Sequence, residues 1–170
     1  MNESNTKHIL SIMVDNEPGV LARVVGLFSG RGYNIESLSV SEVDSDKFLS
    51  RVTIVTSGTK IIIDQIKAQL NKLIPVHNLI DISELNSFIG KELILIKLNV
   101  KKNSVSKIYE FIKKHGAQIL FDNKGELIIE FSGTPSEISE MTTKLNKYNI
   151  IEMTRSGLVS MALGTEYIRK

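Results

Sequence analysis

The sequence predicts an α+β protein built from two tandem ferredoxin-like βαββαβ domains. Three observations support this fold class: the order of the predicted elements, the repetition of that order in the second half, and a composition suited to packed sheets. Of the 170 residues, 42% are hydrophobic, yet there is no Trp and only 6% are aromatic. The core must therefore consist mainly of Ile, Leu and Val, which favour strands and tightly packed helix faces.

Six elements are predicted in the first half of the chain. Apolar residues at helical spacing follow the turn-forming run 15–19, and this helix ends at the Gly-Arg-Gly run 30–32. Leu38 and Val40 alternate with serines, which indicates a half-buried strand. In chain order the elements are a strand at 8–14, a helix through 21–28, strands at 37–41 and 49–57, a helix at 59–73 and a strand at 76–82.

The second half repeats this order. Residues 31–35 (RGYNI) match 115–119 (HGAQI), and the Ser-Gly pair at 57–58 matches the pair at 132–133. The elements are a strand at 92–100, a helix through 105–112, two strands flanking the turn 122–125, a helix at 135–147 and a strand from 150. The predicted domains are therefore 1–83 and 92–170, joined by a linker at 84–91.

Each predicted domain has an open side. A βαββαβ unit carries both helices on one face of its sheet, so the other face and the two edge strands lack a partner within the unit. A domain of about 80 residues also buries little apolar surface, so its core stabilises the fold only marginally. We therefore expect each sheet to pair with another copy or another protein.

Most catalytic and metal-binding chemistry is not indicated. Without cysteines the chain has no disulfides, thiolate nucleophiles or Cys-ligated metals. His8, His77 and His115 fall in separate elements, and the sequence contains no metalloprotease, nucleophile-elbow or phosphate-loop motif. We predict no catalytic residue and no metal site.

Nucleic-acid binding and membrane insertion are not indicated either. The net charge is +2 with basic residues spread along the chain, and the central runs 51–55 and 127–130 contain no aromatic residue on which bases could stack. The N-terminus does not resemble a signal peptide, and no apolar run approaches the roughly 18 residues of a membrane span. We expect a cytoplasmic protein.

The most informative segments flank the first predicted helix. The N-terminus of a helix offers free N–H groups for a carboxylate, and Gly19 would let the backbone approach a ligand. Asn34 could accept a hydrogen bond from an ammonium group, and aliphatic neighbours would form a wall. This chemistry suits an amino acid. The candidate ligand-binding residues are Asn16, Gly19, Val20, Leu21, Asn34 and Ile35.

These segments lie at opposite ends of one helix, so a compact pocket would need two chains in a symmetric dimer. The residues also have a purely structural interpretation. Asn16 would be the N-cap, Pro18 an early helical residue and Gly32 the C-cap. From the residues alone, both interpretations stay open.

Residues 16–28 (NEPGVLARVVGLF) and 31–38 (RGYNIESL) closely resemble the small regulatory subunit of acetolactate synthase, a family of ACT-domain proteins. Residues 50–55 (SRVTIV) extend the match, and the second half resembles the family more loosely, for example at 131–134 (FSGT). The chain departs from the family at Leu163, where an arginine usually precedes the glycine. Contacts of that arginine are not carried over.

The resemblance implies an N-terminal ACT domain, a second ACT-like domain and a homodimer whose N-terminal sheets join edge to edge. It implies that a branched-chain amino acid, usually valine, binds at this interface through the six candidate residues. The chain would itself be non-catalytic and bind no cofactor. It would activate a large catalytic subunit that uses thiamine diphosphate, Mg²⁺ and FAD, and would confer feedback inhibition.

Two alternatives remain. The first is a free-standing tandem-ACT sensor of amino acids that acts on another partner, such as a transcription or signalling protein. The second is a small enzyme whose active site has no recognisable motif. The aliphatic candidates Val20 and Ile35 do not distinguish valine from leucine or isoleucine.

Overall fold

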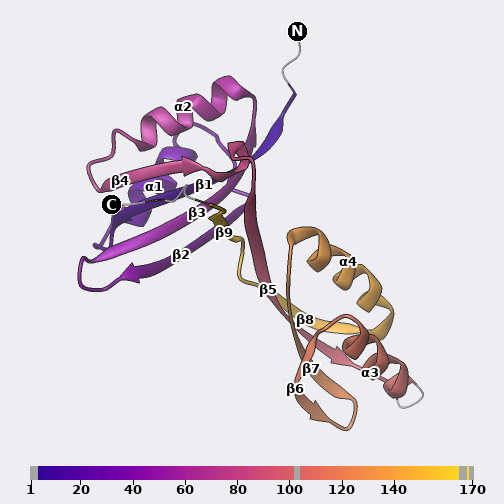
Figure 1. Cartoon of the computed structure of the whole chain (residues 1–170). Coiled ribbons are helices and arrows are strands. Elements are labelled where there is room, and N and C mark those ends of the chain that lie inside the picture. The colour runs from indigo at the N-terminus through magenta and orange to yellow at the C-terminus, as the bar shows by residue number, and fades with distance from the viewer. Residues whose placement is uncertain (1–3, 102–103, 165–167, 169–170) are drawn as a thin grey trace. The chain divides into compact units, whose positions relative to one another are not determined.

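The computed structural model describes residues 4–101, 104–164 and 168 (Figure 1). The chain forms two compact units, which are described separately. The first contains the residues up to Ile89 together with those from Leu158 onward, and the second is Gly90–Gly157. Among the described helices, none combines the length and the apolar character needed to cross a membrane.

The first unit has a four-stranded antiparallel sheet in the order β2-β3-β1-β4. Both helices pack on one face of this sheet, where alternate residues of β1, such as Leu10 and Ile12, are fully buried. The elements are β1 (Thr6–Asp15), α1 (Val20–Ser29), β2 (Ser37–Asp44), β3 (Leu49–Gly58), α2 (Lys60–Leu70), β4 (Val76–Asp81) and the 3₁₀ helix η1 (Ile82–Glu84).

The second unit repeats this topology in the order β6-β7-β5-β8. Ile96, Ile108 and Ile138 belong to its separate core, in which strands and helices again meet on one face. The elements are β5 (Phe88–Asn99), α3 (Val105–Lys114), β6 (Gln118–Asn123), β7 (Glu126–Gly133), α4 (Pro135–Leu145), the 3₁₀ helix η3 (Asn146–Tyr148) and β8 (Ile150–Arg155). The βαββαβ order of both units confirms the predicted fold class.

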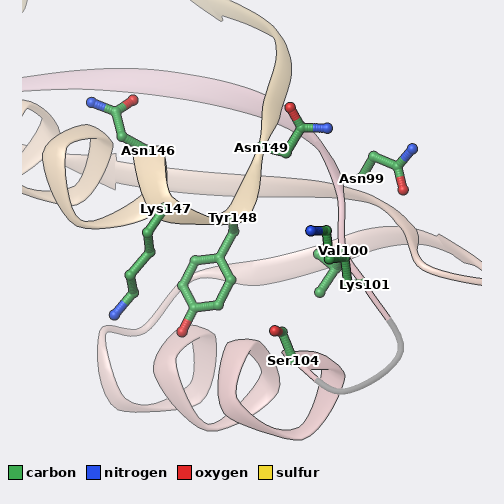
Figure 2. Close-up of a pocket in the computed structure, with 8 residues that line it drawn as sticks. All are labelled: Asn99, Val100, Lys101, Ser104, Asn146, Lys147, Tyr148 and Asn149. Carbon is green, nitrogen blue, oxygen red and sulfur yellow. The ribbon is translucent and has the colours of Figure 1, made fainter.

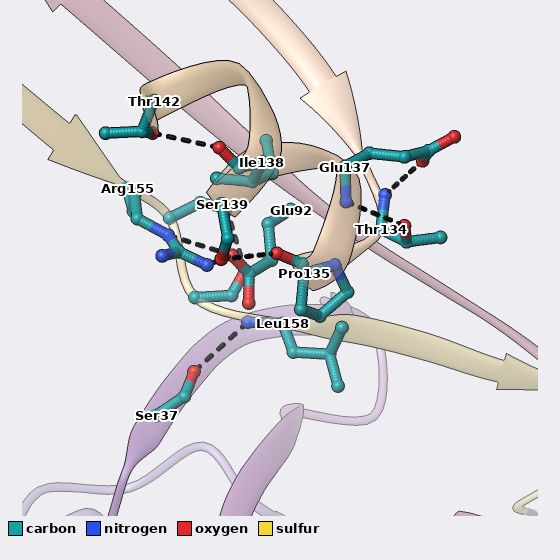
Figure 3. Close-up of polar contacts among 12 residues, drawn as sticks. Ser37, Glu92, Thr134, Pro135, Glu137, Ile138, Ser139, Thr142, Arg155 and Leu158 are labelled. Carbon is teal, nitrogen blue, oxygen red and sulfur yellow. Dashed lines mark hydrogen bonds and ion pairs between the residues drawn. The ribbon is translucent and has the colours of Figure 1, made fainter. Parts of the chain in front are cut away.

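Polar contacts fix the ends of the elements in the second unit (Figure 3). The backbone N–H of Thr134 donates to the carboxylate of Glu137 at 2.7 Å, and the N–H of Glu137 donates to the Thr134 hydroxyl at 3.3 Å. This reciprocal capping box starts α4. Arg155 on β8 donates from Nε to the buried carboxylate of Glu92 on β5 at 2.9 Å, which ties the two strands together.

The end of the chain differs from the predicted division at 83 and 92. A further strand, β9 (Val159–Ala162), pairs with β5, whose first two residues, Phe88 and Ile89, belong to the first unit. The segment from Leu158 belongs to the first unit too. Leu158 is buried with Ile9, Val55 and Ile82, on the sheet face opposite α1 and α2. The segment 84–91 is also not a plain linker, because it includes the end of η1 and the start of β5.

Candidate functional site

The loop before α1 is held by backbone hydrogen bonds to the residues that immediately precede β3 and β4. The N–H of Asp15 donates to the Pro75 carbonyl at 2.9 Å, and that of Asn16 donates to the Phe48 carbonyl at 2.7 Å. The N-cap of α1 is Gly19, so the structural interpretation of Asn16 as the N-cap is wrong. The exposed Asn16 side chain has no hydrogen bond to any other residue within the described ranges.

Gly19 has the geometry of a residue that a side chain would disturb. Its φ of +85° lies in the left-handed region, which is strained for residues other than glycine. A Cβ atom built on Gly19 would have nothing within 4 Å. Its carbonyl accepts from Arg23 N–H at 3.0 Å, and α1 has no side-chain cap. The N–H of Val20 donates to the Glu17 carbonyl at 3.3 Å, whereas those of Leu21 and Ala22 have no backbone partner among the described residues and could bind an anion.

The loop after α1 begins with a glycine in the same region of backbone space. Gly32 has φ of +70°, and the N–H of Tyr33 donates back to the Phe28 carbonyl at 3.0 Å. The C-cap of α1 is Gly30, so the structural interpretation of Gly32 as the C-cap is wrong. Gly32 lies two residues farther on, where the Tyr33 hydrogen bond closes the end of the helix. The carbonyl of Asn34 accepts from the Thr56 hydroxyl at 2.7 Å, while its exposed side-chain amide has no partner among the described residues.

The apolar candidates lie in three different environments. Val20 is only 3% exposed and packs in the core, so it could meet a ligand only through its backbone. Leu21 is 40% exposed, and Ile35 is partly buried against the same core. An aliphatic wall would therefore come from Leu21 and Ile35.

The two loops do not form one pocket within a chain. Helix α1 has ten residues, which corresponds to a length of about 15 Å between the candidate residues at its two ends. The structure brings Asn16, Gly19 and Leu21 together at one end and Asn34 and Ile35 at the other.

A cluster of His8, Asp81 and Glu84 has ligand atoms within 4.8 Å of one another, a spacing that could suit a metal ion. These groups already have protein partners. His8 Nδ1 lies 2.6 Å from Asp81 Oδ2, the Ser83 hydroxyl donates to Asp81 Oδ1 at 2.5 Å, and Lys67 Nζ lies 3.0 Å from both oxygens of Glu84. Since Lys67 already neutralises Glu84, we assign no metal to this cluster.

The second unit has a polar cavity of about 690 Å³ where β5 leads into α3 (Figure 2). It lies at the junction that corresponds to residues 15–19 of the first unit. Lys147 Nζ lies 5.0 Å from the centre of the Tyr148 ring. The lining residues are Asn99, Val100, Lys101, Ser104, Asn146, Lys147, Tyr148 and Asn149.

Sequence reasoning missed a smaller cavity, of about 180 Å³, in the first unit. Arg51 and Ser160 line it, together with residues of β2, β3 and β9. The strand pattern of 49–57 could have placed Arg51 on the face opposite Val52 and Ile54. No local signal could have found Ser160, because it lies more than 100 residues from the strands that it covers.

Two family models match the chain. An "AHAS small subunit-like ACT domain" matches residues 10–78, and "Small subunit of acetolactate synthase" matches residues 91–164. The chain is 38% identical over 160 residues to the probable acetolactate synthase small subunit of Archaeoglobus fulgidus, covering 94% of this chain and 99% of that one. It is 39% identical over 164 residues to the acetolactate synthase small subunit of Mycolicibacterium smegmatis, covering 96% and 95%.

A solved structure has the same fold over almost its whole length. The acetolactate synthase small subunit from Thermotoga maritima superposes with a TM-score of 0.86 at 30% sequence identity, covering 95% of this chain and 99% of that one. Both domains and both family models thus agree with the resemblance carried by residues 16–38. The chain belongs to the acetolactate synthase small subunit family.

Proposed function

We propose that this chain is the regulatory subunit of an acetolactate synthase, which activates the catalytic subunit and makes it sensitive to valine. One observation carries the ligand part of this proposal. The left-handed Gly19 leaves the N-terminus of α1 open, while the side-chain amides of Asn16 and Asn34 have no partner among the described residues.

The chemistry of these groups matches the three parts of a branched-chain amino acid. The N–H groups of Leu21 and Ala22, together with the positive end of the α1 dipole, would bind the carboxylate. The side-chain oxygen of Asn34 would accept from the ammonium group, and Leu21 and Ile35 would contact the aliphatic side chain. A site with all three parts needs residues from both ends of α1, and therefore from two chains.

Edge-to-edge pairing of two first units would supply this geometry. β2 is an edge strand of its sheet, and Asn34 lies three residues before its first residue, Ser37. At the other end of β2, Asp44 pairs with Leu49 of β3. The residue before Leu49 is Phe48, whose carbonyl accepts from Asn16 N–H in the loop before α1. Antiparallel pairing of β2 with its symmetry mate would thus bring Asn34 of one chain toward the 15–19 loop of the other.

The partner in this proposal is the large catalytic subunit. Thiamine diphosphate, Mg²⁺ and FAD would bind to that subunit, and none of them to this chain. Feedback requires two states of the assembly with different affinities for valine, because a ligand shifts an equilibrium only by its differential binding. We propose that valine clamps the two first units and thereby changes the surface that meets the catalytic subunit.

The proposal is tested by reconstitution and by calorimetry. Acetolactate formation by the catalytic subunit is measured with and without this chain, over a range of valine concentrations. We expect the chain to raise the rate and valine to lower it again. In calorimetry, Asn34→Ala should weaken valine binding about ten- to a hundredfold, because a hydrogen bond to a charged group is lost.

Gln118→Ala is the matched control, since Gln118 holds the repeat position of Asn34 in the second unit and is also exposed. It should bind valine like the wild type. An unchanged rate on addition of the chain would contradict activation. Equal valine binding by Asn34→Ala and the wild type would contradict the proposed site, and binding without any effect on catalysis would favour a free-standing sensor.

A further inference from the structure

The sheet face opposite α1 and α2 in the first unit carries a band of hydroxyl groups. The strand register places Ser11 of β1 opposite Thr53 of β3, and Thr53 opposite Ser39 of β2. In the next row Arg51 lies between Met13 and Ser41. These two rows therefore present one guanidinium beside several hydroxyl groups, whereas Ile9 and Val55 farther along the same face are apolar.

Residues 158–161 cover part of this face and border a cavity. Leu158 packs on Ile9 and Val55, and its N–H donates to the Ser37 hydroxyl at 3.2 Å (Figure 3). The following strand, β9, bounds a cavity of about 180 Å³. The lining residues are Ser39, Ser41, Arg51, Thr53, Val159, Ser160 and Met161.

Arg51 brings a positive charge into this cavity without a carboxylate to balance it. Its Nε donates to the Ser11 hydroxyl at 2.7 Å, and no ion pair joins it to an acidic residue of the described chain. Partial burial lowers the pKa of the Arg51 guanidinium below its usual value, but an arginine remains charged throughout the physiological range. Four of its five N–H donors remain available to a ligand.

Ser160 provides a second and independent indication of a ligand. Its side chain is buried, with 8% of the residue exposed, and its Oγ has no hydrogen-bond partner among the described residues. A buried hydroxyl without a hydrogen-bond partner destabilises the folded state. A polar group of a ligand in the cavity would remove this destabilisation.

We propose that this cavity binds one small monocarboxylate, with its carboxylate on Arg51 and a second acceptor oxygen on Ser160. The single guanidinium matches a single negative charge, and its planar fork suits a carboxylate. The cavity has room for about six waters, which corresponds to an acid of three or four carbons. A 2-oxo or 2-hydroxy acid also carries the second acceptor next to its carboxylate. The site lies on the sheet face away from α1 and is separate from the proposed valine site.

The test is calorimetric titration of the full chain with sodium acetate, lactate, pyruvate and inorganic phosphate. We expect one monocarboxylate per chain, with lactate or pyruvate bound more tightly than acetate. Arg51→Gln should weaken binding by at least about tenfold, because it removes a charge-assisted pair. Ser160→Ala should weaken the binding of lactate or pyruvate by about fivefold.

Arg31→Gln removes an equal charge from an exposed position in the same unit and should bind the acids like the wild type. Ser160→Ala without ligand should be at least as stable as the wild type, since it removes an unpartnered hydroxyl, so it remains informative if Arg51→Gln does not fold. Absence of saturable carboxylate binding, preference for phosphate, or equal binding by Arg51→Gln would overturn the proposal. Valine binding should be unaltered in both variants, so the outcome is distinguishable from failure of the valine site.

Discussion

The two strand–helix junctions of the molecule differ although the two units share one topology. In the first unit α1 follows Gly19, whose backbone is left-handed, and neither α1 nor α3 has a side-chain cap. In the second unit α3 follows Ser104, whose backbone lies in the right-handed helical region. The first junction is next to Leu21, an exposed candidate for an aliphatic wall, whereas the second borders a cavity lined by asparagines and lysines.

The C-termini of α1 and α3, by contrast, are alike in the two units. Gly32 and Gly116 both have positive φ, at +70° and +69°, and each is followed by a hydrogen bond that reaches back over the last turn of the helix. These bonds measure 3.0 Å at Tyr33 and 3.1 Å at Ala117. The two units therefore share the glycine and the hydrogen bond that end the helix. They differ at the junction before the helix, where a ligand would bind. This difference favours a specialised role for the 15–19 loop.

The largest expected effect concerns the two cores, which are separate in this structure. Phe28 and Ile112 hold equivalent buried positions in α1 and α3. Phe28→Ala should destabilise the first unit by about 3–5 kcal/mol, and Ile112→Ala should destabilise the second by about 2–5 kcal/mol, because each leaves a cavity. Hydrogen exchange followed by mass spectrometry reports the free energy of opening for each unit.

Each substitution should mainly lower protection in its own unit. The exposed Ile61→Ala is a control and should change protection in neither unit by more than about 0.5 kcal/mol. Equal loss of protection in both units on Phe28→Ala would show that the two units unfold as one and would contradict the separation of the cores.

The fold could be predicted closely because both units are built from local patterns. The alternation of Leu38 and Val40 with serines and the spacing of apolar residues in 21–28 identify their elements, and their bounds differ by only a few residues from those of β2 and α1. The position of the segment after Leu158 could not be predicted. Its burial depends on contacts with Ile9 and Val55, more than 100 residues away, which leave no periodicity in the sequence.

The candidate site was predictable only in part. The sequence identifies Gly19 as a residue of special backbone and Asn34 as a polar group in a loop, and both are exposed. It could not show that Val20 is buried in the core, because a residue in the first turn of a helix can point either way. The cavity at Arg51 was missed since its other wall, Ser160, comes from the distant C-terminal segment.

The next largest effect concerns the junctions themselves. Gly19→Asp should abolish valine inhibition of the reconstituted enzyme, with at least a tenfold loss of valine affinity. It places a negative charge where the ligand carboxylate would bind, and it strains a left-handed position by about 1 kcal/mol. The open space around Gly19 means that the fold should survive. Inhibition curves and valine calorimetry measure the effect.

Ser104→Asp is the matched control, because it places the same charge at the N-terminus of α3. Aspartate is a favourable N-cap, so this variant should fold normally and keep full valine sensitivity. A wild-type response to valine in Gly19→Asp, or an equal loss in Ser104→Asp, would contradict the assignment of the ligand to the first junction.

The smallest effect concerns the second helix of each unit. Thr59 and Thr134 are the N-caps of α2 and α4, but only Thr134 uses its side chain, in the capping box with Glu137. Thr134→Ala should destabilise the second unit by about 1 kcal/mol, whereas Thr59→Ala should cost the first unit much less.

Hydrogen bonds from Thr134 and contact with Lys91 lower the pKa of the Glu137 carboxyl below 4.5. The contribution of Glu137 is therefore present above the unfolded-state pKa and is lost as the pH falls through the lower folded-state value. The stability difference between wild type and Thr134→Ala, measured by hydrogen exchange or denaturant unfolding, should shrink over this acidic range. Equal costs for the two threonine variants would show that the capping box adds nothing to the common N-cap.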